Sequence, residues 1–138
     1  MPVQTALDNR PPPPGARLLG AELIDARPAD GWLRARFEGR PDFCDSTGFI
    51  QAGFLAAMLD DAMGLALFIF SEGRIAAPTL SLQVSFLAHA RPGPLYGEGQ
   101  VVQAGETIAF LEGRLMDLSG TVVARATASA RVAKAIAA

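Results

Sequence analysis

The stretch Ile50–Gly64, IQAGFLAAMLDDAMG, determines the predicted fold. It contains no proline, and its apolar and small residues continue to Phe70, where Ser71–Glu72–Gly73 supplies a stop signal. We therefore predict one long helix that ends near Phe70. This helix is apolar on nearly every side and needs cover all round, yet it carries two adjacent carboxylates, Asp60 and Asp61, at its centre.

The same helix is long enough to cross a membrane, since a span needs about 20 apolar residues. Asp60 and Asp61 would lie at the middle of the span, where an aspartate costs roughly 2.5–3.5 kcal/mol on insertion scales. No belt of lysine or arginine flanks the helix. We therefore expect the core helix of a soluble protein.

Composition limits the function classes. The 138 residues are enough for one domain, and 50% of them are hydrophobic, which suggests that another subunit covers part of the surface. A net charge of −2 without a basic stripe argues against a nucleic-acid partner. One cysteine, Cys44, and one histidine, His89, leave no internal disulfide and little scope for a metal site. The start of the chain does not resemble a signal peptide, so we expect a cytoplasmic protein.

Half of the ten prolines lie in the first fourteen residues. We predict that residues 1–16 form an extended or disordered proline-rich lead, because the run Pro11–Pro14 disfavours a helix or a central strand. Residues 17–138 then form a single domain.

The rest of the domain is predicted to be β-structure. Leu18–Ala26 and Trp32–Glu38 flank a turn and are typical of a hairpin. After the helix, apolar and polar residues alternate, which predicts four strands in a meander: Pro78–Leu87, Leu95–Ala104, Thr107–Met116 and Thr121–Val132. Two-layer packing places one antiparallel sheet against the helix, in an α+β fold. A sheet covers only one side of the helix. The apolar residues on its other side need cover from a second subunit, which indicates a dimer.

The helix has two chemically distinct parts. The neighbours of Asp60 in the sequence are apolar, and burying an unpaired carboxylate among them costs several kcal/mol. A carboxylate in apolar surroundings is typical of a general base or a nucleophile. At the helix head, Gln51, Ala52 and Gly53 offer N–H groups without intrahelical partners that could hold an oxyanion. The structural alternatives are two tolerated acids and a Gly53 that only eases packing.

Ala52 and Asp60 are eight residues apart, or about 12 Å along a helix. One helix therefore cannot bring both to the same carbonyl group. Two antiparallel helices related by a two-fold axis can do so, which predicts a site between subunits, twice per dimer.

The order of elements, with IQAGFLAAMLDDAMG on the helix and SLQVSFLAHARPGPLYGEGQVV after it, resembles the hotdog-fold acyl-CoA thioesterases of the phenylacetate-pathway (PaaI-like) type. The resemblance covers roughly residues 18–132. It implies one long central helix wrapped by a curled antiparallel sheet of five to six strands, in a homodimer or a dimer of dimers. It also implies an acyl-CoA substrate and no metal or redox cofactor.

The resemblance also implies roles for individual residues. Asp60 stands at the position of the general base or nucleophile, and Thr79 at that of a hydroxyl residue that orients the water or the acid. Ala52 and Gly53 stand where the family has two glycines, and the N–H of Ala52 polarises the carbonyl from the other subunit. Gln51 stands where the family has a histidine. Asp61 is expected to be structural or interfacial.

Asp45 stands where the family has an asparagine. An amide can donate a hydrogen bond to the carbonyl oxygen, whereas an ionised carboxylate repels it. Asp45 is therefore protonated, turned away, or a mark of altered activity, and Ala52 adds a methyl group beside the thioester.

These departures keep other functions open. One alternative is a non-catalytic protein that binds acyl-CoA or another acyl ligand. Another is hydration of enoyl thioesters, which is disfavoured because His89, predicted to lie at the surface or in a turn, is outside the helix head. Cys44 is expected to be incidental. Candidate contacts for the coenzyme A phosphates are Arg74, Arg91, Arg125 and Arg131.

Overall fold

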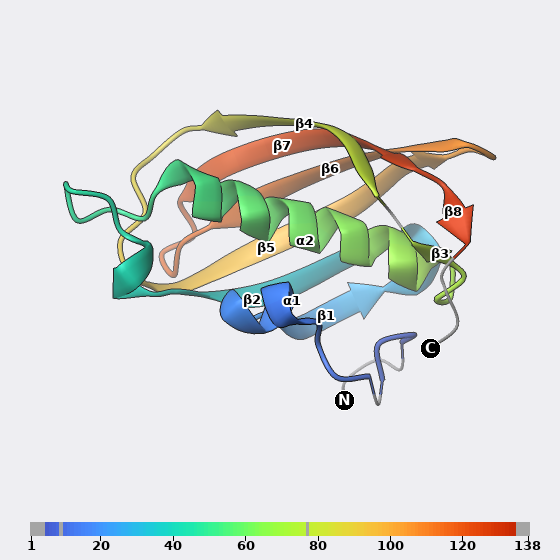
Figure 1. The fold of residues 1–138 in the computed structure, drawn as a ribbon, viewed down its shortest axis with the longest axis horizontal. Helices are drawn as coiled ribbons and strands as arrows, with labels where there is room; N and C mark the ends of the chain where they lie inside the picture. Colours follow the sequence, from blue (N-terminus) through green and yellow to red (C-terminus); the bar gives the residue numbers. More distant parts are fainter. Residues whose placement is uncertain (1–4, 9, 77, 135–138) are drawn as a thin grey trace.

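A computed structural model describes residues 5–8, 10–76 and 78–134. A six-stranded antiparallel sheet curls around one long helix, α2 (Ala52–Phe70), as Figure 1 shows. The predicted α+β hotdog architecture is therefore confirmed. The strands are β1 (Glu22–Arg27), β2 (Trp32–Gly39), β4 (Thr79–Phe86), β5 (Gly93–Ala104), β6 (Ile108–Met116) and β7 (Val122–Arg131).

The sheet order differs from the predicted meander of four strands. The order is β1-β2-β5-β6-β7-β4, so β4 pairs with β7 and not with the next strand in sequence, β5. Both sides of β5 are already occupied, by β2 and by β6. The chain therefore crosses the end of the sheet after β4, and β4 is left at an edge.

Small residues of the sheet allow α2 to lie close to it. A side chain added at Gly99 of β5 would overlap the backbone carbonyl of Ala62. At Gly113 of β6, an added Cβ would lie 3.1 Å from the side chain of Met63. The buried residues of α2 pack here: Leu55, Met58, Leu59, Ala62, Met63, Ala66, Leu67 and Ile69.

By length and composition, α2 could span a membrane. Its eight buried residues instead belong to the hydrophobic core, and Figure 1 shows α2 lying along the concave face of the sheet. This is the setting of a core helix, as the two central aspartates predict.

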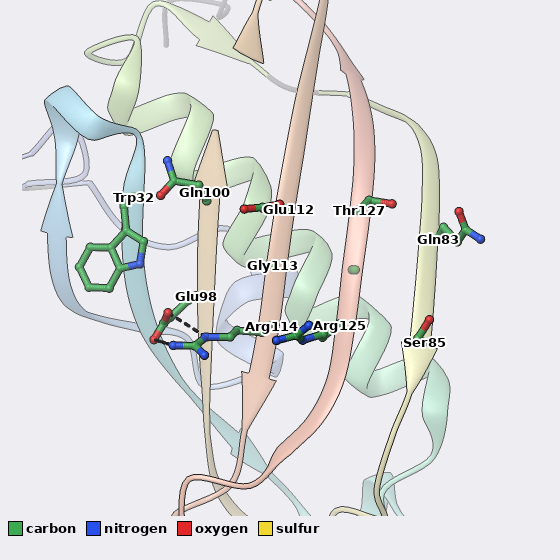
Figure 2. A pocket seen from close by; sticks show the side chains of 11 residues that line it. Trp32, Gln83, Ser85, Glu98, Gln100, Glu112, Gly113, Arg114, Arg125 and Thr127 are labelled. Carbon is green, nitrogen blue, oxygen red and sulfur yellow. Dashed lines mark hydrogen bonds and ion pairs between the residues drawn. The ribbon is translucent and has the colours of Figure 1, made fainter. Parts of the chain in front are cut away.

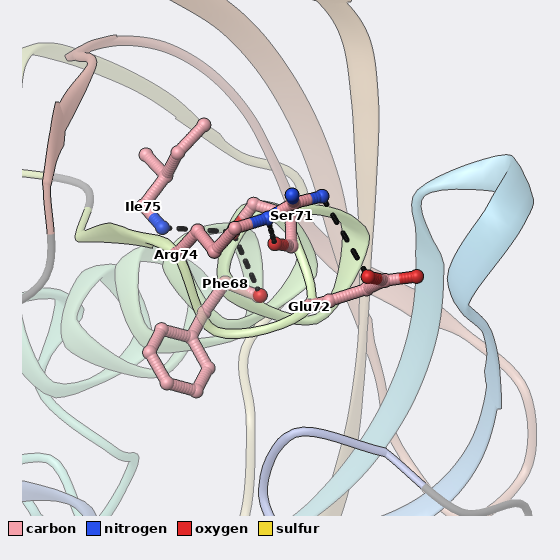
Figure 3. A network of polar contacts seen from close by, with 5 residues as sticks. All are labelled: Phe68, Ser71, Glu72, Arg74 and Ile75. Atoms are coloured by element: carbon pink, nitrogen blue, oxygen red, sulfur yellow. Dashed lines mark hydrogen bonds and ion pairs between the residues drawn. The ribbon is translucent and has the colours of Figure 1, made fainter.

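A polar network ends α2, as the predicted stop signal implies (Figure 3). The Ser71 hydroxyl donates to the carbonyl of Phe68 at 3.0 Å and accepts from the N–H of Ile75 at 2.9 Å. Glu72 then adopts a left-handed φ of 56°, followed by Gly73 at 81°. The chain turns back at this point and continues toward β4.

The lead is not extended throughout. A short helix, α1 (Pro14–Leu18), begins at the last residue of the proline run, so the predicted extended form is wrong for residues 14–16. Proline suits the first position of a helix, because its missing N–H would have no partner there. Single-turn helices also lie at η1 (Pro28–Asp30) and η2 (Pro41–Phe43), and a small second sheet joins β3 (Ile75–Ala76) to β8 (Ala133–Lys134).

Candidate active site

Asp60 and Thr79 meet although they belong to different elements. The Thr79 hydroxyl donates a hydrogen bond of 2.6 Å to Oδ1 of Asp60. A bulge in β4 makes this contact possible. Thr79 pairs with the buried Ala130, but Ser81 pairs with its neighbour Ser129, so one residue is inserted between them.

Because of this bulge, Thr79 lies on the opposite face of β4 from the one that simple alternation predicts. Strict alternation places Thr79 on the same face as Ser81, Gln83 and Ser85. Because paired residues lie on the same side of a sheet, the pairing with Ala130 places Thr79 on the face that carries α2.

A pocket of about 660 Å³ opens beside this pair. Asp60, Asp61 and Thr79 line it together with the apolar side chains of Leu65 and Phe68. The opposite wall comes from the proline-rich lead and from β1. The volume falls within the usual range for small-molecule sites, about 300–1,000 Å³.

Asp61 lies in the same pocket but in different surroundings. Its Oδ2 is buried and has no hydrogen-bond partner among the described residues. Burial, and secondarily the negative charge of Asp60, raise the pKa of Asp61 to about 6. Asp61 therefore resists ionisation, whereas Asp60 has a hydroxyl donor.

The head of α2 is anchored through its backbone. The N–H of Ile50 donates to Ala90 at 2.8 Å, and the N–H of Gln51 donates to Phe43 at 3.0 Å. No side chain caps this terminus within the described residues. Gln51, Ala52 and Gly53 are exposed, so the first N–H groups of the helix remain accessible.

The carboxylate of Asp45 is engaged within its own loop. It accepts hydrogen bonds from the hydroxyl of Thr47 and from the Thr47 N–H, the latter at 2.8 Å. The hydroxyl bond, followed by the backbone bond, lowers the pKa of Asp45. These contacts argue against a protonated Asp45 and favour a carboxylate turned toward its loop.

Within one chain the predicted residues form two separate groups. Asp60 and Thr79 lie together in the pocket, whereas Gln51, Ala52 and Gly53 lie at the helix head. Asp45 belongs to the loop that precedes the head. The eight-residue separation, about 12 Å along α2, keeps the two groups apart.

His89 and Cys44 take no part in the Asp60 pocket. His89 is exposed and stacks on Phe49, with ring centroids 4.3 Å apart. Cys44 is half-buried in the loop before α2. In the described part of the chain, no group of three His, Cys, Asp or Glu residues could hold a metal ion.

The four candidate arginines lie outside this pocket. Arg74 pairs with Glu72 at 3.6 Å, and Arg91 lies over the ring of Phe49. Arg125 lines a hollow of about 570 Å³ on the outer face of the sheet, shown in Figure 2. The arginine that does line the Asp60 pocket is Arg10 of the lead, which the sequence did not single out.

Solved structures share this architecture. A phenylacetic acid degradation-related protein from Ralstonia eutropha JMP134, described as a candidate thioesterase, is 30% identical with a TM-score of 0.86, covering 92% of this chain and 96% of its own. The PaaI protein of the Escherichia coli phenylacetic acid degradation operon is 19% identical with a TM-score of 0.77, covering 88% and 86%. The protein smu.793 of Streptococcus mutans UA159, bound to acetyl-CoA, is 20% identical with a TM-score of 0.73, covering 83% and 89%.

The fold and these neighbours define a hotdog protein of the PaaI-like type. The thioesterase superfamily model matches residues 47–124, more than half of the chain, so the protein belongs to the thioesterase superfamily. It is therefore a thioester hydrolase. No curated protein sequence matches the chain.

Proposed function

We propose that the protein hydrolyses acyl-CoA thioesters at a site completed by two subunits. The observation that carries the proposal is the 2.6 Å hydrogen bond from Thr79 to Asp60 at the wall of a ligand-sized pocket. Acyl-CoA is proposed as the substrate because a structural neighbour binds acetyl-CoA. A cytoplasmic location and the lack of a metal or redox cofactor remain expectations.

In the proposed reaction, Thr79 holds Oδ1 of Asp60, so that Oδ2 faces the attacking water. Asp60 accepts a proton from this water as the oxygen adds to the thioester carbonyl. The N–H groups of Ala52 and Gly53 from the second subunit hold the oxyanion. Collapse of the intermediate breaks the C–S bond, and the proton on Asp60 passes to the departing coenzyme A thiolate. Gln51 shapes the carbonyl pocket.

Nucleophilic attack by Asp60 is the alternative route. Its carboxylate would form a mixed anhydride and release the thiolate, and water would then hydrolyse the anhydride. Both routes need the same acid and the same oxyanion donors, so the proposed site does not depend on the choice.

The exposed surface supports a two-subunit site. β4 is an edge strand, and its large apolar residues Leu80 and Phe86 are 55% and 47% exposed. The open side of α2 carries small residues, and an added side chain at Gly53 or Gly64 would meet nothing within 4 Å. An antiparallel pairing of two copies along β4 and α2 would cover both surfaces and place the head of one helix near Asp60 of the other.

The direct test is release of free thiol from a panel of acyl-CoAs by the wild type and by Asp60→Asn. We expect the substitution to lower kcat by at least about 100-fold, because the amide can neither accept the proton nor attack. Asp30→Asn is the matched control, since Asp30 is exposed and outside the pocket. Equal rates for Asp60→Asn and the wild type would contradict the assignment.

A second candidate function is binding of acyl-CoA without turnover. The ionised Asp45 favours it, because a carboxylate cannot donate to the thioester carbonyl as an amide would. Calorimetric binding of coenzyme A thioesters with no thiol release on any chain length would support this function.

A further inference from the structure

We infer that the N-terminal strap, defined as Leu7 and Arg10–Pro13, forms the far wall of the acyl pocket and selects acyl groups with an apolar chain long enough to reach it from Asp60. This inference rests on the proposed function and extends it to the class of substrate. It concerns residues that the predicted catalytic set does not include.

The strap is held in place by its own contacts. The N–H of Arg10 donates to the carbonyl of Leu7 at 3.1 Å, and Leu7 lies within a turn that is closed by hydrogen bonds between Thr5 and Asp8. Leu7 is half-buried and packs against the hydrophobic core. The chain then enters α1, where Arg17 donates to the carbonyl of Pro13 at 3.0 Å.

The strap faces the second half of α2. The guanidinium carbon of Arg10 lies 5.1 Å from the ring centroid of Phe68, a cation–π contact. Phe68 and Asp60 line the same pocket and are eight residues apart, about 12 Å along the helix. An acyl group that reacts at Asp60 and extends along α2 therefore meets Phe68 and the strap at its far end.

The lining of the pocket between Asp60 and the strap is mainly apolar. Leu7, Leu65, Phe68 and the prolines of the strap supply this wall. The guanidinium of Arg10 lies over the ring of Phe68 at the far end. The pocket therefore suits an acyl group with an apolar chain that extends from Asp60 toward the strap.

The test for the strap is Leu7→Trp in the full-length protein, with acetyl-CoA and hexanoyl-CoA as substrates. The larger side chain fills the far end of the pocket, which acetyl does not reach. We expect kcat/KM to fall at least about tenfold for hexanoyl-CoA and to change less than about twofold for acetyl-CoA. Leu18→Trp is the matched control, because Leu18 is 50% exposed on α1 and does not line the pocket.

An equal change for both substrates would overturn the strap assignment. If Leu7→Trp lowers the melting temperature, Arg10→Ala replaces it, with Arg17→Ala as its control, and must change the hexanoyl to acetyl ratio without such a loss.

Failure of the proposed function would give a different result. If no thioester is hydrolysed, the non-hydrolysable thioethers S-ethyl-CoA and S-hexyl-CoA still report on the strap by calorimetry. Selective weakening of S-hexyl-CoA binding in Leu7→Trp would support the strap even without catalysis. Equal affinities of the wild type and Leu7→Trp for S-hexyl-CoA would refute it.

Discussion

The two adjacent aspartates of α2 differ because their surroundings differ. Asp60 accepts a hydrogen bond of 2.6 Å from the Thr79 hydroxyl, which satisfies Oδ1 of its carboxyl group. Asp61 has a buried oxygen without a partner in the described chain, and its pKa is raised to about 6. The doubled acid therefore comprises one carboxylate with a donor and one without.

The raised pKa of Asp61 predicts a pH-dependent stability. The unfolded value is 3.8 and the folded value is about 6, so between these pH values the folded state binds more protons than the unfolded state. The free energy of unfolding of the protein therefore falls as pH rises from 3.8 to about 6. Above this range, the full destabilisation caused by the ionised Asp61 is present. Asp61→Asn should be nearly neutral at pH 3.5 and should raise the free energy of unfolding by roughly 3 kcal/mol at pH 8.

Urea unfolding of the wild type and Asp61→Asn at both pH values, at one protein concentration, checks this prediction. Asp30→Asn, an exposed acid-to-amide change, is the control. An equal difference between wild type and Asp61→Asn at pH 3.5 and pH 8 would show that ionisation of Asp61 does not cause the effect.

At the scale of elements, the fit between α2 and the sheet depends on small residues. The φ angle of Gly99 is not positive, so its backbone conformation is compatible with alanine. A Gly→Ala substitution at a position with free space stabilises a protein by about 0.4–1 kcal/mol. At Gly99, however, an added Cβ would overlap the carbonyl of Ala62. The helix must move away, and overpacking of this kind costs about 1–3 kcal/mol.

We therefore expect Gly99→Ala to lower the free energy of unfolding, as measured by chemical denaturation. Gly15→Ala is the matched control, because an added Cβ there meets nothing within 4 Å. A stabilising effect at Gly99 equal to that at Gly15 would contradict the close seat of α2 on the sheet.

The sequence predicted the elements that carry a long periodic signal. The apolar run predicted the extent of α2 nearly to the residue, because Ser71–Gly73 marks its end. A turn indicated the first two strands, and alternation together with turn signals located the four strands after the helix. The face occupied by Thr79 could not be predicted from alternation, because a bulge inserts a residue without any mark in composition. The resemblance, not the periodicity, pointed to the pairing of Thr79 with Asp60.

Other features of the structure were not predicted from the sequence, also for physical reasons. β3 and β8 have two residues each, too few for a periodic pattern. The strap contacts α2 through tertiary packing of Leu7 and Arg10, which local propensity does not encode. The place of β4 beside β7 follows from which edges are already occupied, and this is a property of the whole sheet.

At the scale of the whole molecule, the proposed mechanism needs two groups that a single chain keeps apart. The helix head and Asp60 lie on one helix about 12 Å apart, and the edge strand β4 and the open side of α2 remain exposed. In the dimer that we propose, a second copy covers these surfaces and supplies the other half of the site. The central claim is therefore that each active site takes its acid from one subunit and its oxyanion donor from the other.

Ala52 permits a selective loss of the oxyanion donor. It is the first residue of α2, and Gln51 before it is extended, with φ −62° and ψ 139°. Both features suit a proline, which removes the N–H while leaving the helix intact. Ala52→Pro and Asp60→Asn therefore each disable one half of every site, and each variant alone should be nearly inactive.

The most direct measurement is the thiol-release activity of dimers assembled from an equal mixture of Ala52→Pro and Asp60→Asn subunits. Half of the random dimers are mixed, and each mixed dimer has one site with both intact halves. The mixture should regain about one quarter of wild-type activity per subunit. With mixed dimers verified by native mass spectrometry, activity no higher than the mean of the two parents would contradict a site shared between subunits.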